Sequence, residues 1–215
     1  NWGKVNKQAF ASPFPFNHVA LHYSPVKLQE VILKSEYFNV QEQHIDDYGQ
    51  IDSDFIFDCR GKHITNWKDY DTLINPLNSV LLREEESKDC DINWTRAVAT
   101  PDGWTFVIPN TSQTTSYGYL YNDEITSTKE ASDNFEEVFS LTNKKAHNLK
   151  FKSYVAKIPI IDERIILGGN RLFFLEPLES TAIQAYLFWA RRTFDWIIED
   201  VITPSLITQE IIKYM

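Results

Sequence analysis

Short runs of alternating apolar and polar residues dominate the middle of the chain, between residues 67 and 154. An alternation with a period of two is typical of β-strands that bury one face. Turn-forming residues such as Asn75-Pro76 and Pro101-Asp102-Gly103 separate the runs, which favours hairpins. We therefore predict an antiparallel sheet, with strands at Ser79–Leu82, Trp94–Ala99, Gly103–Pro109 and Thr115–Tyr121.

Three tyrosines of the last run, Tyr117, Tyr119 and Tyr121, fall on one face of the predicted strand. Such a row of rings could form the wall of a binding site for an indole. A strand that packs against the protein interior needs the same row, and this structural interpretation is the stronger one. At the level of the sequence both interpretations stay open. The preceding Glu84-Glu85-Glu86 is expected to be a solvated turn.

Capping residues predict two helices, one before and one after the strands of the predicted sheet. Ser24-Pro25 combines an N-cap residue with a proline at the first helical position. The inward face of that helix would consist of Leu28, Val31, Ile32 and Ser35. Ser127-Thr128-Lys129-Glu130 is a capping box, which opens a second helix through Phe135, Val138 and Phe139.

Toward the C-terminus the apolar residues recur with a helical period. One stripe of the long helix consists of Ile183, Leu187, Ala190, Phe194 and Ile197. Three aromatic residues lie off this stripe and are expected in the core rather than against a ligand: Phe188, Trp189 and Trp196. Thr203-Pro204 predicts the start of a last helix, which runs to Met215.

Three further runs predict short strands, at His18–Tyr23, Phe38–Ile45 and Asp54–Cys59. His18 and His22 would share one face of the first strand. No third ligand lies nearby, so we expect no metal site there. The third run ends in Asp58-Cys59-Arg60-Gly61, where Arg60 either meets a phosphate or marks an ordinary exit of the strand from its sheet.

Charge and composition argue against several classes of partner. The 215 residues carry 21 basic and 30 acidic side chains, for a formal net charge of −9, and show no basic stripe. This argues against binding to nucleic acid or to an anionic membrane. No apolar run is long enough to span a bilayer and no signal-peptide core is present, so a cytoplasmic protein is expected. Cys59 and Cys90 lack a C-x-x-C pattern and are expected to be buried free thiols.

The stretch 165–185 combines a strand, a glycine turn and the start of the long helix. After the apolar residues 165–167, Gly168-Gly169 allows positive φ or a close approach of a ligand to the backbone. Pro177 suits the first turn of a helix, whose unpaired N–H groups lie at the positive end of the helix dipole. Glu179-Ser180-Thr181 would add a carboxylate and two hydroxyls to this anion-binding turn.

Two motifs resemble those of the flavin-dependent tryptophan halogenases, a family within the FAD-dependent monooxygenases. Residues Phe174-Leu175-Glu176-Pro177-Leu178-Glu179-Ser180-Thr181 are similar to the signature of that family. Residues Gly103-Trp104-Thr105-Phe106-Val107-Ile108-Pro109 resemble its tryptophan-x-tryptophan-x-isoleucine-proline motif, in the expected order. The resemblance implies an α/β (mixed α+β) fold, a partial form of the FAD-monooxygenase-like fold. Its antiparallel sheet would lie on the substrate side and its helices at the C-terminus.

The resemblance further implies one intertwined domain in three parts, truncated at both ends. Residues 1–66 would be a partial FAD-domain segment, 67–160 the substrate-side sheet, and 161–215 the flavin and halide segment with the C-terminal helices. Asn1-Trp2 resembles the tail of a family sequence that follows a lysine, which would lie upstream. No G-x-G-x-x-G occurs, so the dinucleotide-binding turn is absent from these residues. The 215 residues alone are therefore expected to be inactive and not to hold FAD.

As for chemistry, the resemblance implies an enzyme that uses reduced FAD, oxygen and chloride or bromide. It would halogenate an aromatic substrate such as tryptophan or another indole, and a flavin reductase would supply the reduced FAD. Glu179 matches the family's catalytic glutamate, which stabilises the cationic arene and removes its proton, and Ser180 supports it. The backbone N–H groups of Thr181 and Ala182 match the halide site.

The remaining site residues follow from the same two motifs. FAD contacts are expected at Gly168, Gly169, Asn170, Pro177 and Leu178. The sheet motif, a structural barrier in the family, would be formed by Trp104, Phe106, Ile108 and Pro109.

The sequence departs from the family at three places: Ala182 replaces a glycine, Phe106 replaces the second tryptophan, and Asn170-Arg171 replaces small residues. Two alternatives stay open, namely a monooxygenase or oxidoreductase of the same fold that does not halogenate, and a non-catalytic remnant that binds a partner.

Overall fold

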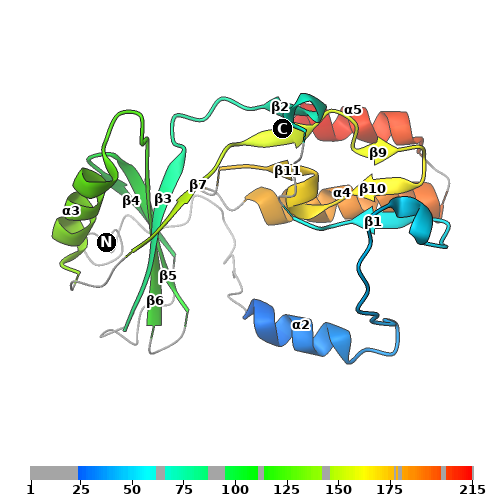
Figure 1. The fold of residues 1–215 in the computed structure, drawn as a ribbon, viewed down its shortest axis with the longest axis horizontal. Coiled ribbons are helices and arrows are strands. Elements are labelled where there is room, and N and C mark those ends of the chain that lie inside the picture. The colour runs from blue at the N-terminus through cyan, green and yellow to red at the C-terminus, as the bar shows by residue number, and fades with distance from the viewer. Residues whose placement is uncertain are drawn as a thin grey trace, which may run out of the picture. The chain divides into compact units, whose positions relative to one another are not determined.

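A computed structural model describes residues 24–61, 66–86, 95–110, 114–141, 146–176, 178, 181–199 and 202–214. The chain forms two compact units, each assembled from two separate segments (Figure 1). Unit 1 contains residues 1–44 and 79–149, and unit 2 contains residues 45–78 and 150–215. Both contain helices and strands, which confirms the predicted mixed α/β class. No helix of the described ranges is long and apolar enough to cross a membrane.

Unit 1 is built on a five-stranded sheet in the order β4-β5-β6-β3-β7 (Figure 1). Its strands are β3 (Ser79–Glu86), β4 (Arg96–Thr100), β5 (Gly103–Pro109), β6 (Thr114–Tyr121) and β7 (His147–Lys150). The pairs β3–β6, β4–β5 and β5–β6 are antiparallel, which confirms the predicted sheet. The expected turn at Glu84-Glu85-Glu86 is wrong, because these residues extend β3 and pair with 114–116 of β6.

Helix α3 (Thr128–Phe139) packs on this sheet. The predicted helix start is confirmed with Ser127 as N-cap, since the Ser127 Oγ accepts a hydrogen bond from the Glu130 N–H at 3.2 Å. The shared core consists of Leu81, Tyr119, Tyr121, Ala131 and Phe135. Tyr117 packs against the same cluster, with its ring centroid 5.4 Å from that of Phe139. The tyrosine row is therefore an interior face of the sheet and not the wall of an indole site.

Helix α2 (Pro25–Leu33) begins as predicted, with Ser24 as N-cap. Its predicted inward face is wrong, because no residue of α2 is buried and Leu28 and Val31 are exposed. The predicted strand Phe38–Ile45 is also wrong, since this stretch pairs with no other strand among the described residues. Alternation alone does not make a strand where no partner offers backbone hydrogen bonds. The predicted strand His18–Tyr23 lies outside the described residues.

Unit 2 contains two three-stranded sheets, in the orders β1-β10-β9 and β11-β8-β2 (Figure 1). The first consists of β1 (Ile56–Asp58), β10 (Ile165–Leu167) and β9 (Ile160–Ile161). The second consists of β11 (Phe173–Phe174), β8 (Tyr154–Ala156) and β2 (Tyr70–Thr72). Strands β1 and β10 run parallel, whereas the other pairs are antiparallel.

Helices α4 (Thr181–Ile197) and α5 (Pro204–Tyr214) complete unit 2, and the start of α5 is as predicted. Trp189 is buried, and its indole N–H donates to the Leu167 carbonyl at 2.9 Å. Its core position is confirmed. The predicted apolar stripe of α4 does not face the core: Ile183, Leu187 and Phe194 are exposed. The buried face carries Ala185, Trp189 and Thr193 instead, because it is the face that meets β10 and its neighbours.

Candidate functional site

The candidate site lies where the parallel strands β1 and β10 end. The register pairs Ile56 with Ile165 and Asp58 with Leu167, and the Gly168 N–H donates to the Asp58 carbonyl at 2.9 Å. The Asp58-Cys59-Arg60-Gly61 segment and the glycine turn therefore leave the sheet at the same edge. In α/β proteins, ligands bind at the carboxyl ends of parallel strands. This geometry brings together two segments that the sequence singled out separately.

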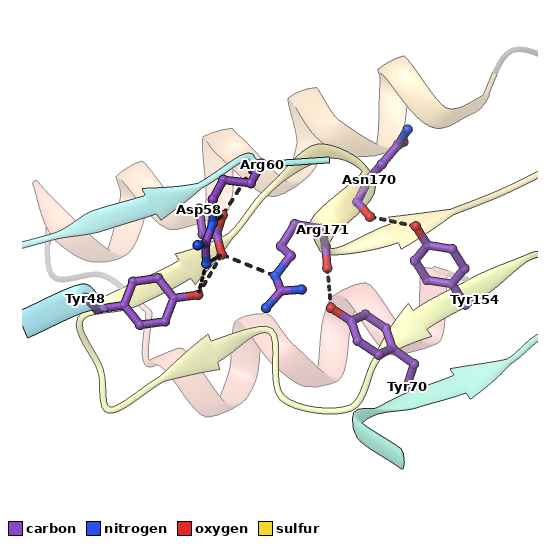
Figure 2. Close-up of polar contacts among 7 residues, drawn as sticks. All are labelled: Tyr48, Asp58, Arg60, Tyr70, Tyr154, Asn170 and Arg171. Carbon is purple, nitrogen blue, oxygen red and sulfur yellow. Dashed lines mark hydrogen bonds and ion pairs between the residues drawn. The ribbon is translucent and has the colours of Figure 1, made fainter. Parts of the chain in front are cut away.

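The Asp58 carboxylate is the centre of a polar cluster at this edge (Figure 2). Arg60 donates to it through Nε and Nη2, both at 2.9 Å, and the Arg171 Nε lies 3.2 Å from Oδ2. The Tyr48 hydroxyl also donates to Oδ2, at 2.6 Å. The Asp58 side chain is only 1 % exposed, whereas that of Arg60 is 48 % exposed. One buried carboxylate thus holds two arginines and a tyrosine.

The cluster keeps Asp58 ionised. Burial alone would raise the pKa of the Asp58 carboxyl, but hydrogen bonds from Arg60 and Tyr48 outweigh it and hold that pKa well below its usual range. With Asp58 charged, the two arginines leave a net positive charge at the edge of the sheet. The Arg60 side chain does not simply extend into solvent, because it folds back onto Asp58. A phosphate that met Arg60 would therefore also meet the contacts of Arg60 with Asp58.

Tyrosine hydroxyls donate hydrogen bonds to the glycine turn, residues 168–171 (Figure 2). The Tyr154 hydroxyl donates to the Asn170 carbonyl at 2.7 Å, and the Tyr70 hydroxyl donates to the Arg171 carbonyl at 3.0 Å. The Tyr186 hydroxyl donates to the Asn170 Oδ1 at 2.8 Å. Burial raises the pKa of Tyr154 and of Tyr186 to about 12, so both remain protonated donors at neutral pH. Two part-buried hydrogen bonds therefore hold backbone carbonyls of this turn, and a third holds the Asn170 side chain.

The two glycines of the turn have different physical roles. A Cβ at Gly168 would lie 2.7 Å from the Cys59 Sγ, so Gly168 packs closely against this side chain. Gly169 has φ +52° and no atom within 4 Å of a built Cβ, so its backbone faces open space. Cys59 itself is exposed, which corrects the expectation of a buried thiol; Cys90 lies outside the described residues.

Helix α4 begins at Thr181. Leu178 lies in a turn before it. The Glu176 carboxylate accepts a hydrogen bond from the Leu178 N–H at 2.9 Å, a local contact that competes with helix formation. Thr181 and Ala182 are the first two residues of α4, where helix geometry leaves N–H groups without an acceptor inside the helix. Pro177, Glu179 and Ser180 lie outside the described residues.

The sheet motif belongs to unit 1. Trp104, Phe106, Ile108 and Pro109 all lie on β5, and the rings of Trp104 and Phe106 are 6.2 Å apart. Phe106 pairs with Gly118 across β5 and β6, and a Cβ on Gly118 would lie 2.0 Å from the Phe106 ring. Gly118 is therefore the position that accommodates the phenylalanine. The sequence offered a signal for it, since a glycine within a run of tyrosines indicates close packing.

Sequence reasoning missed half of the Asp58 cluster and the tyrosines that contact the glycine turn. Tyr48, Tyr70, Tyr154 and Arg171 were not singled out as candidates, although all four contact the two turns. Arg171 reaches Asp58 across 113 residues, and Tyr70 reaches the Arg171 carbonyl across 101 residues. Contacts at such separations leave no local pattern. The described residues also contain no group of three metal-ligating side chains, and His18 and His22 lie outside them.

Residues of the glycine turn fit a bound flavin nucleotide in three respects. The turn lies at the carboxyl edge of a parallel pair, the Gly169 backbone faces open space, and the Asp58 cluster supplies net positive charge. In one respect the fit is limited, because the Asp58 carboxylate is already engaged by Arg60, Arg171 and Tyr48. A cofactor would thus meet the backbone and the arginines rather than this carboxylate.

A glycine turn at the carboxyl edge of parallel strands is common among α/β proteins that bind nucleotide cofactors. The sequence profile of the tryptophan halogenase family matches residues 26–209, and the chain belongs to this family. No curated protein matches the chain.

Several solved structures share the fold. A flavin-dependent halogenase from Xanthomonas campestris is 21 % identical with a TM-score of 0.59, covering 74 % of this chain and 34 % of its own. The lanthipeptide tryptophan 5-halogenase MibH is 18 % identical with a TM-score of 0.63, over 74 % of this chain and 32 % of its own. The tryptophan 6-halogenase SttH from Streptomyces toxytricini is 20 % identical with a TM-score of 0.61, over 75 % and 33 %. The chain spans about a third of the length of these proteins.

Proposed function

We propose that the chain is part of a flavin-dependent halogenase, which uses reduced FAD, oxygen and a halide to halogenate an aromatic substrate such as tryptophan or another indole. The observation that carries the proposal is the shared carboxyl edge of β1 and β10, where the glycine turn leads into the motif before α4. Membership of the tryptophan halogenase family supports it. Because the chain spans about a third of its structural relatives, this activity is proposed for the longer protein.

The glycine turn is the proposed place of the flavin. Gly168, Gly169 and Asn170 would present backbone to it, and Pro177 and Leu178 would follow on the way to α4. Bound reduced FAD would supply the oxidising equivalent that it draws from oxygen. The hydrogen bonds from Tyr154 and Tyr70 to the turn support this role, because they hold its backbone in place without occupying the open side of Gly169. A preformed turn binds a ligand at a lower entropic cost.

The start of α4 is the proposed halide and catalytic segment. The N–H groups of Thr181 and Ala182 would hold the halide, since a helix N-terminus attracts anions. Glu179 would stabilise positive charge on the arene and accept its proton, with Ser180 in support. In β5, Trp104, Phe106, Ile108 and Pro109 would form the barrier that the family motif implies.

A flavin reductase is the proposed source of reduced FAD, and a cytoplasmic location is the proposed setting. Nucleic acid and membranes are not proposed as partners, because the net charge of −9 is unfavourable for both polyanions.

A monooxygenase of the same fold that does not halogenate is the second candidate. Ala182 favours it, because a methyl group stands where the family has glycine, next to the proposed halide amides.

The experiment is a halide-dependence assay on the longer protein that carries these residues. It would be supplied with FAD, a flavin reductase, oxygen and tryptophan or indole, and products would be followed by mass spectrometry. A product whose mass and isotope pattern follow the added chloride or bromide supports the halogenase. An oxygenated product that forms equally without halide would establish the monooxygenase instead.

A further inference from the structure

A pocket of about 410 Å³ lies within unit 2, between the end of β10 and the strands β8 and β2. This volume falls in the range of roughly 300–1,000 Å³ that is usual for small-molecule sites. Gly168, Gly169 and Asn170 are not among its lining residues, although Leu167 and Arg171 on either side of them are. Its apolar wall consists of Ala156, Ile158, Ile161 and Leu167.

Three of the six polar residues of this pocket are cationic. Lys68, Lys157 and Arg171 line it together with a single carboxylate, that of Asp69. Lys157 pairs with Asp71 and Arg171 pairs with Asp58, so Lys68 is the lining cation that forms no ion pair among the described residues. An apolar wall opposite cationic groups is the combination that binds an apolar body with one negative charge.

Lys157 lines the pocket and is held in position by hydrogen bonds. Its Nζ donates to the Lys68 carbonyl at 2.9 Å, and its backbone N–H donates to the Asp69 carbonyl at 2.9 Å. Its Nζ also lies 3.6 Å from the Asp71 Oδ1, an ion pair between side chains that are 46 % and 66 % exposed. An ammonium group has three N–H donors, and the Lys68 carbonyl takes one. A pre-positioned cation loses little side-chain entropy when an anion binds.

Arg171 is the least exposed of the three cations. Its Nε contacts Asp58, and its side chain is 19 % exposed. Its backbone carbonyl accepts the Tyr70 hydroxyl, and Tyr70 also lines the pocket. Figure 2 shows the Arg171 side chain directed to Asp58, and Arg171 is also a lining residue of the pocket. Arg171 connects the two, so an anion in the pocket would share this cation with Asp58.

We propose that this pocket binds a small organic carboxylate, whose apolar body lies against Ile161 and Leu167 and whose carboxylate meets Lys68, Lys157 and Arg171. The apolar wall excludes a bare inorganic anion as the preferred ligand, because such an ion would leave that wall in contact with water. The cationic residues exclude a neutral apolar molecule, because they would lose hydration without gaining a partner. The proposal does not depend on flavin or halide chemistry.

The test is an NMR titration of the ¹⁵N-labelled 215-residue chain with benzoate, with benzamide as the neutral analogue of the same shape and inorganic phosphate as the bare anion. Benzoate is expected to shift the amide signals of Lys68, Tyr70, Lys157 and Ile161 in a saturable way. Benzamide and phosphate are expected to bind several-fold more weakly. Equal shifts from benzoate and benzamide, or stronger binding of phosphate, would overturn the proposal.

Two lysine variants of the pocket and one control variant outside it test where benzoate binds. Lys68→Gln retains the contact with Lys157, because that contact uses the main-chain carbonyl of Lys68. It is expected to weaken benzoate binding about fivefold, as does the loss of a partly exposed ion pair. Lys157→Arg keeps the charge and is expected to retain most of the affinity. Lys129→Gln removes an exposed lysine of unit 1 that pairs with Asp133, and it should leave the titration unchanged. Equal effects of Lys68→Gln and Lys129→Gln would show that only overall charge matters.

Discussion

At the scale of single residues, Asp58 is the group whose surroundings are most unusual. It is buried, ionised and hydrogen-bonded to two arginines and a tyrosine that come from different parts of unit 2. Removing one partner of a buried ion pair is strongly destabilising, because the other charges lose their compensation. Asp58→Asn preserves the shape of the side chain but removes the negative charge that Arg60 and Arg171 contact.

We expect Asp58→Asn to lower the free energy of unfolding by about 3 kcal/mol at neutral pH. Urea denaturation followed by circular dichroism would measure it. Asp133→Asn is the matched control, because Asp133 forms an exposed pair with Lys129 and should cost less than about 0.5 kcal/mol. Equal effects of the two substitutions would show that the cluster does not stabilise the fold.

The same group predicts a pH dependence. The folded-state pKa of Asp58 lies below its unfolded value, so its stabilisation is complete above the unfolded pKa of about 3.9 and is lost as pH falls toward the folded pKa. The stability difference between the parent and Asp58→Asn should therefore shrink below about pH 4. Denaturation curves at neutral and acidic pH would detect this. A difference that stays constant would contradict the depressed pKa.

Glu179 and Glu176 can be separated at the same scale. In the longer protein, Glu179→Gln removes the proposed base and should reduce halogenation by roughly a hundredfold or more. Oxygen consumption should continue, with peroxide released instead of product. Glu176→Gln is the comparison, because Glu176 accepts the Leu178 N–H and should act through the stability of the turn. Halogenation that survives Glu179→Gln but not Glu176→Gln would show that the motif has been matched to the wrong glutamate.

At the scale of elements, the contact between the two turns rests on Gly168. A Cβ at this position would lie 2.7 Å from the Cys59 Sγ, so Gly168→Ala should force the two turns apart and cost about 1–3 kcal/mol. Adding Cys59→Ala removes the obstructing sulfur and should restore most of the loss. A double-mutant cycle by urea denaturation measures the coupling.

Gly169→Ala is the control for backbone strain. Its φ of +52° disfavours alanine, but no side chain obstructs the Cβ, so Cys59→Ala should not rescue it. If Cys59→Ala rescued both alanine variants or neither, the close packing of Gly168 on Cys59 would not explain the requirement for glycine.

The elements that could be predicted from the sequence are those with strong local signals. The strand Gly103–Pro109 and the helix start at Ser127 were predicted where they occur, because turn and capping residues act over three or four positions. The exposure of the apolar stripe of α4 was not predicted, because Ile183 and Leu187 have the same helical spacing as core residues. Which face of a helix is buried depends on its neighbours, and β10 selects the face that carries Trp189.

The same distinction applies to the candidate site. The glycine turn and the Asp58 segment each have a local pattern, and both were recognised. Their proximity follows from the parallel pairing of strands that are more than 100 residues apart, as does the Arg171 contact with Asp58 across 113 residues. Tyrosine hydroxyls that donate to backbone carbonyls likewise leave no pattern in the sequence, because almost any tyrosine can do so.

At the scale of the whole molecule, the site holds only part of what a dinucleotide needs. The parallel portion of its sheet consists of β1 and β10, and β1 is an edge strand in the order β1-β10-β9. Ile56 donates to Arg164 and Asp58 accepts from Gly168, so the backbone groups of Phe57 point to the open edge. No described strand pairs with that edge. The sequence also contains no G-x-G-x-x-G, the turn that holds the pyrophosphate.

We therefore expect the 215-residue chain not to bind FAD tightly, although its glycine turn fits the flavin. Most dinucleotide affinity comes from the pyrophosphate turn and its helix N-terminus, and neither the Asp58 cluster nor Gly169 replaces them. Titration of the chain with FAD, followed by flavin fluorescence, should show no tight saturable quenching. A longer polypeptide that includes a G-x-G-x-x-G should show tight saturable quenching. Asp58→Asn in that polypeptide should weaken FAD binding by disturbing Arg60 and Arg171. Tight binding by the 215 residues alone would mean that the arginine cluster and the glycine turn suffice for the cofactor.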